Sequence, residues 1–218
     1  MSLVVVTPDK SELMGARDLS QNIIQELMKT ETLNVVGIGN SITLVIAAVN
    51  ISRNIANVNI KSVSIDYIPL TTNYRPEAIF FELSKAASAI SSIVKSFEAQ
   101  SHDTIAAQSI GVRRSDRIET ATSIILWKLN KYDTIKVMAS GFAIMTAIRS
   151  ALQVTTSGIT RQQVGINAIT VDSVEREERR GEAVITKKVP AIQVYLEKGK
   201  ETCYPVNHKE VIEKVTAR

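Results

Sequence analysis

Hydrophobic positions in the first 84 residues alternate between strand-like runs and helical spacing. Runs rich in β-branched and aromatic residues predict strands at 3–7, 33–38, 58–65 and 78–83. Apolar residues three and four positions apart predict helices at 11–27 and 41–55, with Ser11 as the cap of the first. The predicted order of elements is therefore βαβαββ.

The second half of the chain repeats this order. Strands are predicted at 104–112, 134–139, 164–174 and 191–196, and helices at 115–129 and 142–154. The closing strands of the two halves share local sequence, and the second strands align with Leu33 in the position of Thr134. The repeated order predicts a duplicated chain.

This repeat divides the chain into four segments. Residues 1–84 and 103–199 form the two predicted units, residues 85–102 a helical linker, and residues 200–218 a tail with a short helix at 208–215. The predicted fold class is α/β, of the α+β type. Each unit is expected to be a mixed sheet with two helices on one face.

The composition indicates an ordered protein, because 44% of its 218 residues are hydrophobic and 22% are charged. A single cysteine, Cys203, excludes an internal disulfide, and two histidines do not supply a His/Cys metal centre. No apolar run approaches the ~20 residues that span a bilayer, and residues 1–10 lack a signal-peptide pattern. We expect a cytoplasmic protein with no cofactor, no metal and no membrane contact.

Charge is distributed unevenly between the two halves. Residues 1–84 carry a net charge of −2, whereas residues 85–218 carry +6. A basic half joined to a slightly acidic half indicates that the second half meets a polyanion.

Arg113 and Arg114 lie where a predicted strand gives way to a helix, with Arg117 one turn further on. Adjacent guanidinium groups and free backbone N–H groups at a helix start suit phosphate. The alternative is a solvated surface pair that Asp116 and Glu119 neutralise.

A polar excursion at 173–188, here called the arm, separates the last two strands of the second unit. Gly181 is its expected turn residue. Four glutamates leave it a net charge of +1, and the alternative is a hairpin whose glutamates pair with its own basic groups. Its candidate phosphate-binding residues are Arg176, Arg179, Arg180, Lys187 and Lys188.

No segment carries a recognisable catalytic pattern, because a nucleophile elbow, a paired-carboxylate motif and metal-ligand spacing are all absent. The glycines at 37 and 39 lack the rest of a nucleotide-binding loop, so a tight turn is expected there. Trp127, Phe80, Phe81 and Phe142 are expected on core or interface faces, which gives no aromatic platform for single strands. We expect no enzymatic activity.

Several motifs of the second unit occur together in one known family. Residues 109–114 (SIGVRR) resemble its opening strand and basic loop, 124–129 (IILWKL) its first helix, and 135–144 (IKVMASGFAI) its second strand followed by Gly, one residue and Ala-Ile. Residues 166–173 and 191–198 resemble its terminal hairpin. Together they resemble the Alba family of small archaeal chromatin and RNA-binding proteins, and residues 3–84 resemble a fainter copy.

The resemblance implies a tandem Alba-like protein, in which the two units form an intramolecular pseudo-dimer and homo-oligomers beyond it can form. It also implies that the arm reaches toward the minor groove of a duplex. On the second-strand loop, where the family has basic residues, this chain has Met138, Ser140 and Phe142. The first unit has only Lys10 in its first loop, so we expect the second unit to carry the binding.

The sequence thus predicts a non-enzymatic, chromatin-type protein that grips DNA or RNA phosphates through the 113–117 loop and the arm. Binding is expected to be largely independent of sequence, and the protein to be nucleoid-associated if its ligand is DNA. The alternative is a protein-interaction or assembly module that retains the fold with little nucleic-acid binding.

Overall fold

The computed structural model describes residues 2–71, 73–85, 108–156, 163–180, 183–202, 204 and 208–217, without the side chains at 13, 179, 180 and 183. Gly181, nearly all of the predicted linker and residues 104–107 of a predicted strand lie outside the described residues.

The first unit contains β1 (Ser2–Val6), α1 (Pro8–Leu13), α2 (Ala16–Lys29), β2 (Thr32–Ile38), η1 (Gly39–Ser41), α3 (Ile42–Ala56), β3 (Asn59–Tyr67) and β4 (Glu77–Ser84). The second contains β5 (Ser109–Gly111), α6 (Ile118–Lys131), β6 (Thr134–Ser140), α7 (Ala143–Thr156), β7 (Val164–Arg180) and β8 (Ala183–Lys198), and α8 (His208–Thr216) follows it.

The strands form two four-stranded mixed sheets with the same topology. Their orders are β1-β2-β4-β3 and β5-β6-β8-β7. In each sheet the first two strands are parallel, and the remaining pairs are antiparallel. The predicted α+β class with mixed sheets is therefore confirmed.

The register of the sheets refines the alignment of the two units. Leu33 lies opposite Leu83, and Ile135 lies opposite Leu196, so Leu33 corresponds to Ile135 rather than to Thr134. The same alignment matches Gly39 with Gly141, and these glycines have φ values of 55° and 58°. Both second strands thus end in a left-handed turn that favours glycine.

The first predicted helix is wrong in one respect, because the structure has two helices there. α1 begins at Pro8, and the Ser11 hydroxyl donates to the Pro8 carbonyl at 2.6 Å inside that helix instead of capping a longer one. Gly15 then precedes α2, and its N–H donates to the Asp18 carboxylate at 3.2 Å. Met14 and Gly15 both have extended backbone, so α1 ends before α2 begins.

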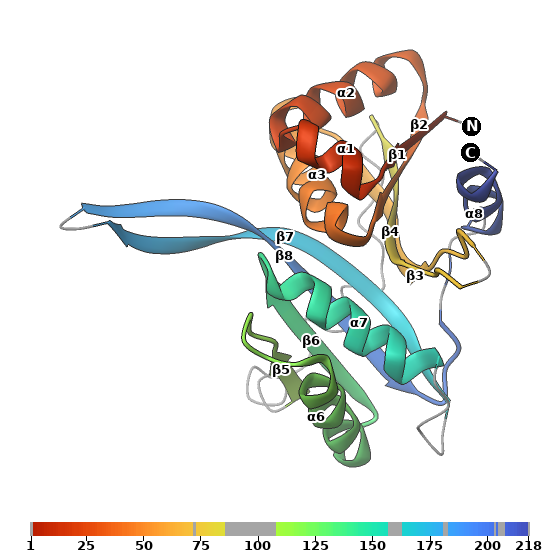
Figure 1. Cartoon of the computed structure of the whole chain (residues 1–218), viewed down its shortest axis with the longest axis vertical. Helices are drawn as coiled ribbons and strands as arrows, with labels where there is room; N and C mark the ends of the chain where they lie inside the picture. Colours follow the sequence, from red (N-terminus) through yellow and green to blue (C-terminus); the bar gives the residue numbers. More distant parts are fainter. Residues whose placement is uncertain are drawn as a thin grey trace.

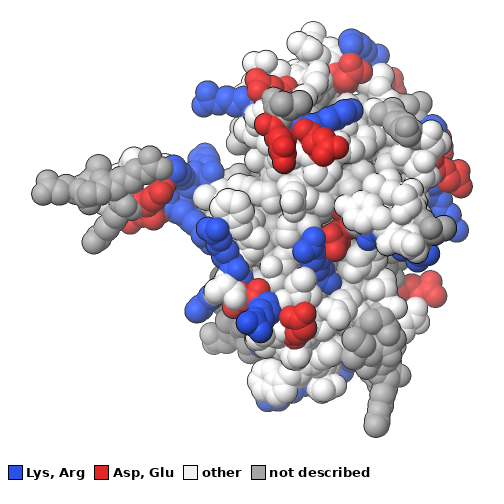
Figure 2. All heavy atoms as spheres, in the orientation of Figure 1, with Lys and Arg blue, Asp and Glu red and all other residues white. Residues whose placement is uncertain are grey.

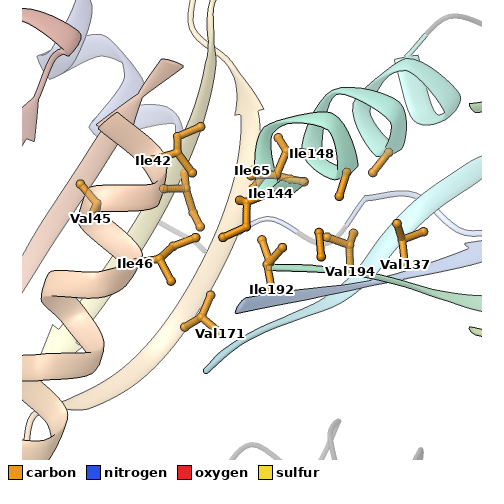
Figure 3. Close-up of a cluster of buried hydrophobic side chains, with 14 of the residues drawn as sticks. Ile42, Val45, Ile46, Ile65, Val137, Ile144, Ile148, Val171, Ile192 and Val194 are labelled. Carbon is orange, nitrogen blue, oxygen red and sulfur yellow. The ribbon is translucent and has the colours of Figure 1, made fainter. Parts of the chain in front are cut away.

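One hydrophobic core joins the two units. It contains residues of α2 and α3 from the first unit and of α6 and α7 from the second, together with one face of each sheet. Figure 3 shows Ile42 and Ile46 of α3 pointing toward Ile144 of α7 and Ile192 of β8. α3 contacts α7, and it also packs on β7 and β8.

The other face of the first sheet is covered by α8, so the C-terminal helix belongs to the packed structure. Val36 and Phe80 lie in a second hydrophobic cluster with Val211 and Val215 of α8. Figure 1 shows α8 beside the first sheet, with the two ends of the chain close together. The helix predicted at 208–215 is confirmed.

The arm is an extended hairpin that projects from the body (Figure 1). β7 and β8 remain paired from Ser173 and Pro190 outward to Arg180 and Ala183. In the first unit no strand is assigned among the described residues between Tyr67 and Glu77. The two units therefore differ most in this connection.

Candidate nucleic-acid interface

The loop between β5 and α6 is closed by its own aspartate. The Arg113 N–H donates to the Asp116 carboxylate at 2.7 Å, and the Asp116 N–H donates back to the Arg113 carbonyl at 3.1 Å. Arg113, Arg114 and Arg117 are exposed, and none forms an ion pair with another described residue. Asp116 thus binds backbone and leaves the guanidinium charges uncompensated.

The loop between β6 and α7 holds Phe142 out in solvent. Gly141 has a φ of 58°, and a Cβ there would lie 3.1 Å from Cγ1 of Val189. Its N–H donates to the Pro190 carbonyl at 2.8 Å, and its carbonyl accepts the Ile144 N–H at 3.2 Å. These bonds fix the turn at the root of the arm.

Two of the aromatic residues expected on core or interface faces lie outside the core. Phe142 is 75% exposed and Trp127 is 54% exposed, whereas Phe80 and Phe81 are buried. Trp127 lies two residues from the buried Ile125, on the opposite side of a helix. Phe142 lies just before α7 and likewise two residues from a buried isoleucine, Ile144. The helical spacing of the sequence therefore already placed both aromatic residues away from the buried side.

One contact joins the two loops to each other, and a second joins the end of β6 to the arm. The Arg114 guanidinium lies over the Phe142 ring, 4.7 Å from its centroid. Arg176 of the arm donates from Nη2 to the Ser140 hydroxyl at 2.6 Å. These contacts link Arg114, Phe142, Ser140 and Arg176, and together with the exposed neighbour Arg113 they are here called the loop–arm surface. Figure 2 shows Lys and Arg side chains gathered where the arm leaves the body.

The remaining candidate residues do not all join this surface. Lys187 pairs with Glu178 at 2.6 Å, so this part of the arm neutralises itself. Lys188 follows Lys187 along β8 and therefore points to the other face of the arm. Arg117 is exposed immediately before α6. The side chains of Arg179 and Arg180 lie outside the described residues.

A groove of about 850 Å³ lies on that other face, between the end of α3 and the root of the arm, and Lys188 lines it together with Glu175. Asn50 donates to the Asp172 carbonyl at 2.8 Å, and Arg53 donates to the Val171 carbonyl at 3.3 Å. Its lining mixes both signs of charge, unlike the loop–arm surface. No local sequence pattern indicates this groove, because it depends on how the two units meet.

The corresponding loops of the first unit are closed. α1 occupies the place of the arginine loop and contacts η1. Ser41 is fully buried, and its hydroxyl donates to the Val6 carbonyl at 2.6 Å and accepts the Ile38 N–H at 2.8 Å. Among its described residues, the first unit therefore presents no open counterpart of the loop–arm surface.

Lys128 does not add to the surface, although it lies in the segment that resembles the family's first helix. Its Nζ donates to the Ser109 carbonyl at 2.7 Å, which ties α6 to β5. Burial lowers the pKa of its ammonium group. It serves as an internal contact rather than as an exposed cation.

A cluster around His208 has the residue types of a Ser-His-Asp site. Nε2 lies 3.1 Å from the Asp66 carboxylate, and Nδ1 lies 3.2 Å from the Ser64 hydroxyl. Ser64 is 3% exposed and His208 5%, so a substrate does not reach the hydroxyl. Tyr204 stacks on the imidazole with a centroid separation of 4.4 Å. The cluster fastens α8 to β3.

No family model and no curated protein matches the chain. Within the described residues, no three His, Cys, Asp or Glu side chains are grouped as metal ligands would be. Among the helices of the same residues, none is long and apolar enough to cross a membrane.

Proposed function

We propose that the chain is a tandem Alba-like protein that binds DNA or RNA through phosphates at the loop–arm surface. The observation that carries the proposal is the contact of Arg114 with Phe142 and of Arg176 with Ser140. The two contacts bring arginines that are far apart in the sequence, both from the basic half of the chain, to the same turn at the root of the arm.

The chemistry of the patch suits a phosphate backbone. Each guanidinium has five donors, so the single bond from Arg176 to Ser140 leaves others for phosphate oxygens. Forked donors bind phosphate in bidentate geometry. Contacts of this kind carry no base information, so binding is largely independent of sequence.

The test is a fluorescence-anisotropy titration of the full chain with duplex DNA and duplex RNA over a series of salt concentrations. Phosphate contacts from the three arginines of the loop–arm surface give a log–log slope of about −3 on duplex DNA. Arg113→Glu with Arg114→Glu should weaken binding about 100-fold or more, because charged hydrogen bonds become repulsive contacts. The matched control is Arg17→Glu with Arg75→Glu, the same charge change at exposed sites of the first unit. A flat salt response contradicts the proposal.

One observation favours the alternative of an assembly module. Ile124 and Trp127, three residues apart on α6, are 40% and 54% exposed. An apolar helix face of this kind can pair with a second copy of the chain. Sedimentation of the wild type and of Trp127→Ala tests this alternative. Self-association of the wild type that the substitution removes supports an assembly module, and a monomeric wild type and variant reject it.

A further inference from the structure

We propose that Phe142 stacks on an unpaired base, so that single-stranded nucleic acid is the preferred ligand of the loop–arm surface. This inference rests on the proposed function and adds the class of strand that is bound. It starts from the ring itself, which is 75% exposed although it belongs to a well-packed turn.

The core does not need this side chain. The buried positions of α7 include Ile144, Ala147 and Ile148, and Phe142 lies two residues before the first of them. Gly141 holds the turn through its bonds to Pro190 and Ile144, so the ring is presented on a fixed backbone. An aromatic ring fixed in solvent loses little conformational entropy when a flat ligand covers it.

The surroundings of the ring match a nucleotide. Arg114 lies over the ring at 4.7 Å from the centroid, and the exposure of Phe142 leaves the rest of the ring accessible. Ser140, two residues away, holds Arg176 on the side of the arm. Phosphates can therefore bind next to a stacked base, the arrangement that proteins use on single strands.

A duplex cannot use the ring in the same way. Its bases stack on one another, and exposing a face requires unstacking that costs a few kcal/mol. The duplex can still reach the arginines through its backbone. Loss of the ring should therefore weaken single-strand binding selectively, whereas loss of the arginines should weaken both.

The experiment measures the Kd of the full chain for a polyuridine strand of about 20 nucleotides, enough to cover one site, and for a duplex RNA of the same length. Phe142→Ala should weaken single-strand binding about 5- to 150-fold, the range for removing one stacked base, and duplex binding less than about twofold. Phe142→Tyr should retain affinity. The matched control is Trp127→Ala, an exposed aromatic with Lys131 over its ring at 3.9 Å, and it should leave both affinities unchanged.

A second readout reports the stacking directly. Trp127 is the only tryptophan, so Phe142→Trp with Trp127→Phe places a single fluorophore in the loop. Polyuridine should quench its emission, and the duplex should not. Equal effects of Phe142→Ala on both ligands, or an unquenched tryptophan, overturn the stacking proposal. If binding still depends on salt in that case, the proposed function stands. A wild-type chain that binds neither ligand overturns both.

Discussion

Arg149 of α7 holds Glu77 at the start of β4 through two parallel hydrogen bonds. Nε lies 2.9 Å from Oε1, and Nη2 lies 3.3 Å from Oε2. The side chain of Glu77 is 14% exposed and that of Arg149 is 40% exposed. The pair joins the two units at the edge of their joint core, where a forked geometry fixes orientation as well as distance.

A double-mutant cycle on this pair should show coupling between the units. Glu77→Gln, Arg149→Met and the double variant give a coupling energy of about 1 kcal/mol from chemical denaturation, since solvent screens the half-exposed arginine. The loss of stability in each single variant should appear as one cooperative unfolding transition at a lower denaturant concentration. Additive effects of the two substitutions would show that the ion pair contributes no coupling.

Ile46→Asp should unfold the whole chain rather than one unit. Ile46 is fully buried where α3 faces the second unit, and an unpaired carboxylate there costs several kcal/mol. Ile55→Asp on the same helix is the matched control, because Ile55 is 72% exposed. Circular dichroism melts should show a folded control and loss of both units in the Ile46 variant. A surviving transition from the second unit would refute the joint core.

The periodic pattern of the chain predicted the elements and their order well, because strands and helices each bury one side of a repeating spacing. The break at Gly15 was missed, since α1 is short and its last residue, Leu13, continues the three- and four-residue spacing of α2. Mixed sheets were predicted, whereas the strand order within them and the place of α8 were not. Its contact with Phe80 and Val36 joins segments at opposite ends of the chain.

The sequence predicted the basic residues of the candidate site, but not the contacts between them and their neighbours. Arg113 and Arg114 could be selected because adjacent basic residues at a strand end are a local pattern. The roles of Ser140 and Phe142 depend on the turn at Gly141 and on the path of the arm, which are set by tertiary hydrogen bonds. Lys187 was grouped with the binding residues, yet its position across the hairpin pairs it with Glu178.

His208→Ala should release α8 from the first sheet. The substitution removes the bonds to Asp66 and Ser64 and the stack with Tyr204, which lowers stability by about 1–3 kcal/mol. Hydrogen exchange should rise over α8 and the covered face of the sheet before it rises elsewhere. Lys209→Ala, at an exposed neighbour, is the control and should leave exchange unchanged.

Alkaline pH should weaken the same region. Partial burial and the Asp66 carboxylate raise the pKa of Tyr204 to about 12 from 10.0. A tyrosine with a higher pKa in the folded state binds its proton more tightly when folded, so its stabilisation is complete below about pH 10 and disappears as the pH rises through about 12. In thermal melts between about pH 10 and 12, the melting temperature of Tyr204→Phe should fall less than that of the wild type. Parallel curves for the two proteins would contradict this linkage.

The two units should contribute unequally to nucleic-acid binding. Lys10 is the only basic residue of α1, which occupies the place of the arginine loop, and the adjacent turn is closed by the buried Ser41. Lys10→Glu should therefore change the Kd for duplex DNA less than about threefold, the effect of a charge near but outside the contact. Arg114→Glu, an equal change of charge on the loop–arm surface, should weaken binding about tenfold or more. Both proteins should melt at the wild-type temperature, because both side chains are exposed. Equal losses from the two variants would place nucleic acid on both units and refute the asymmetry.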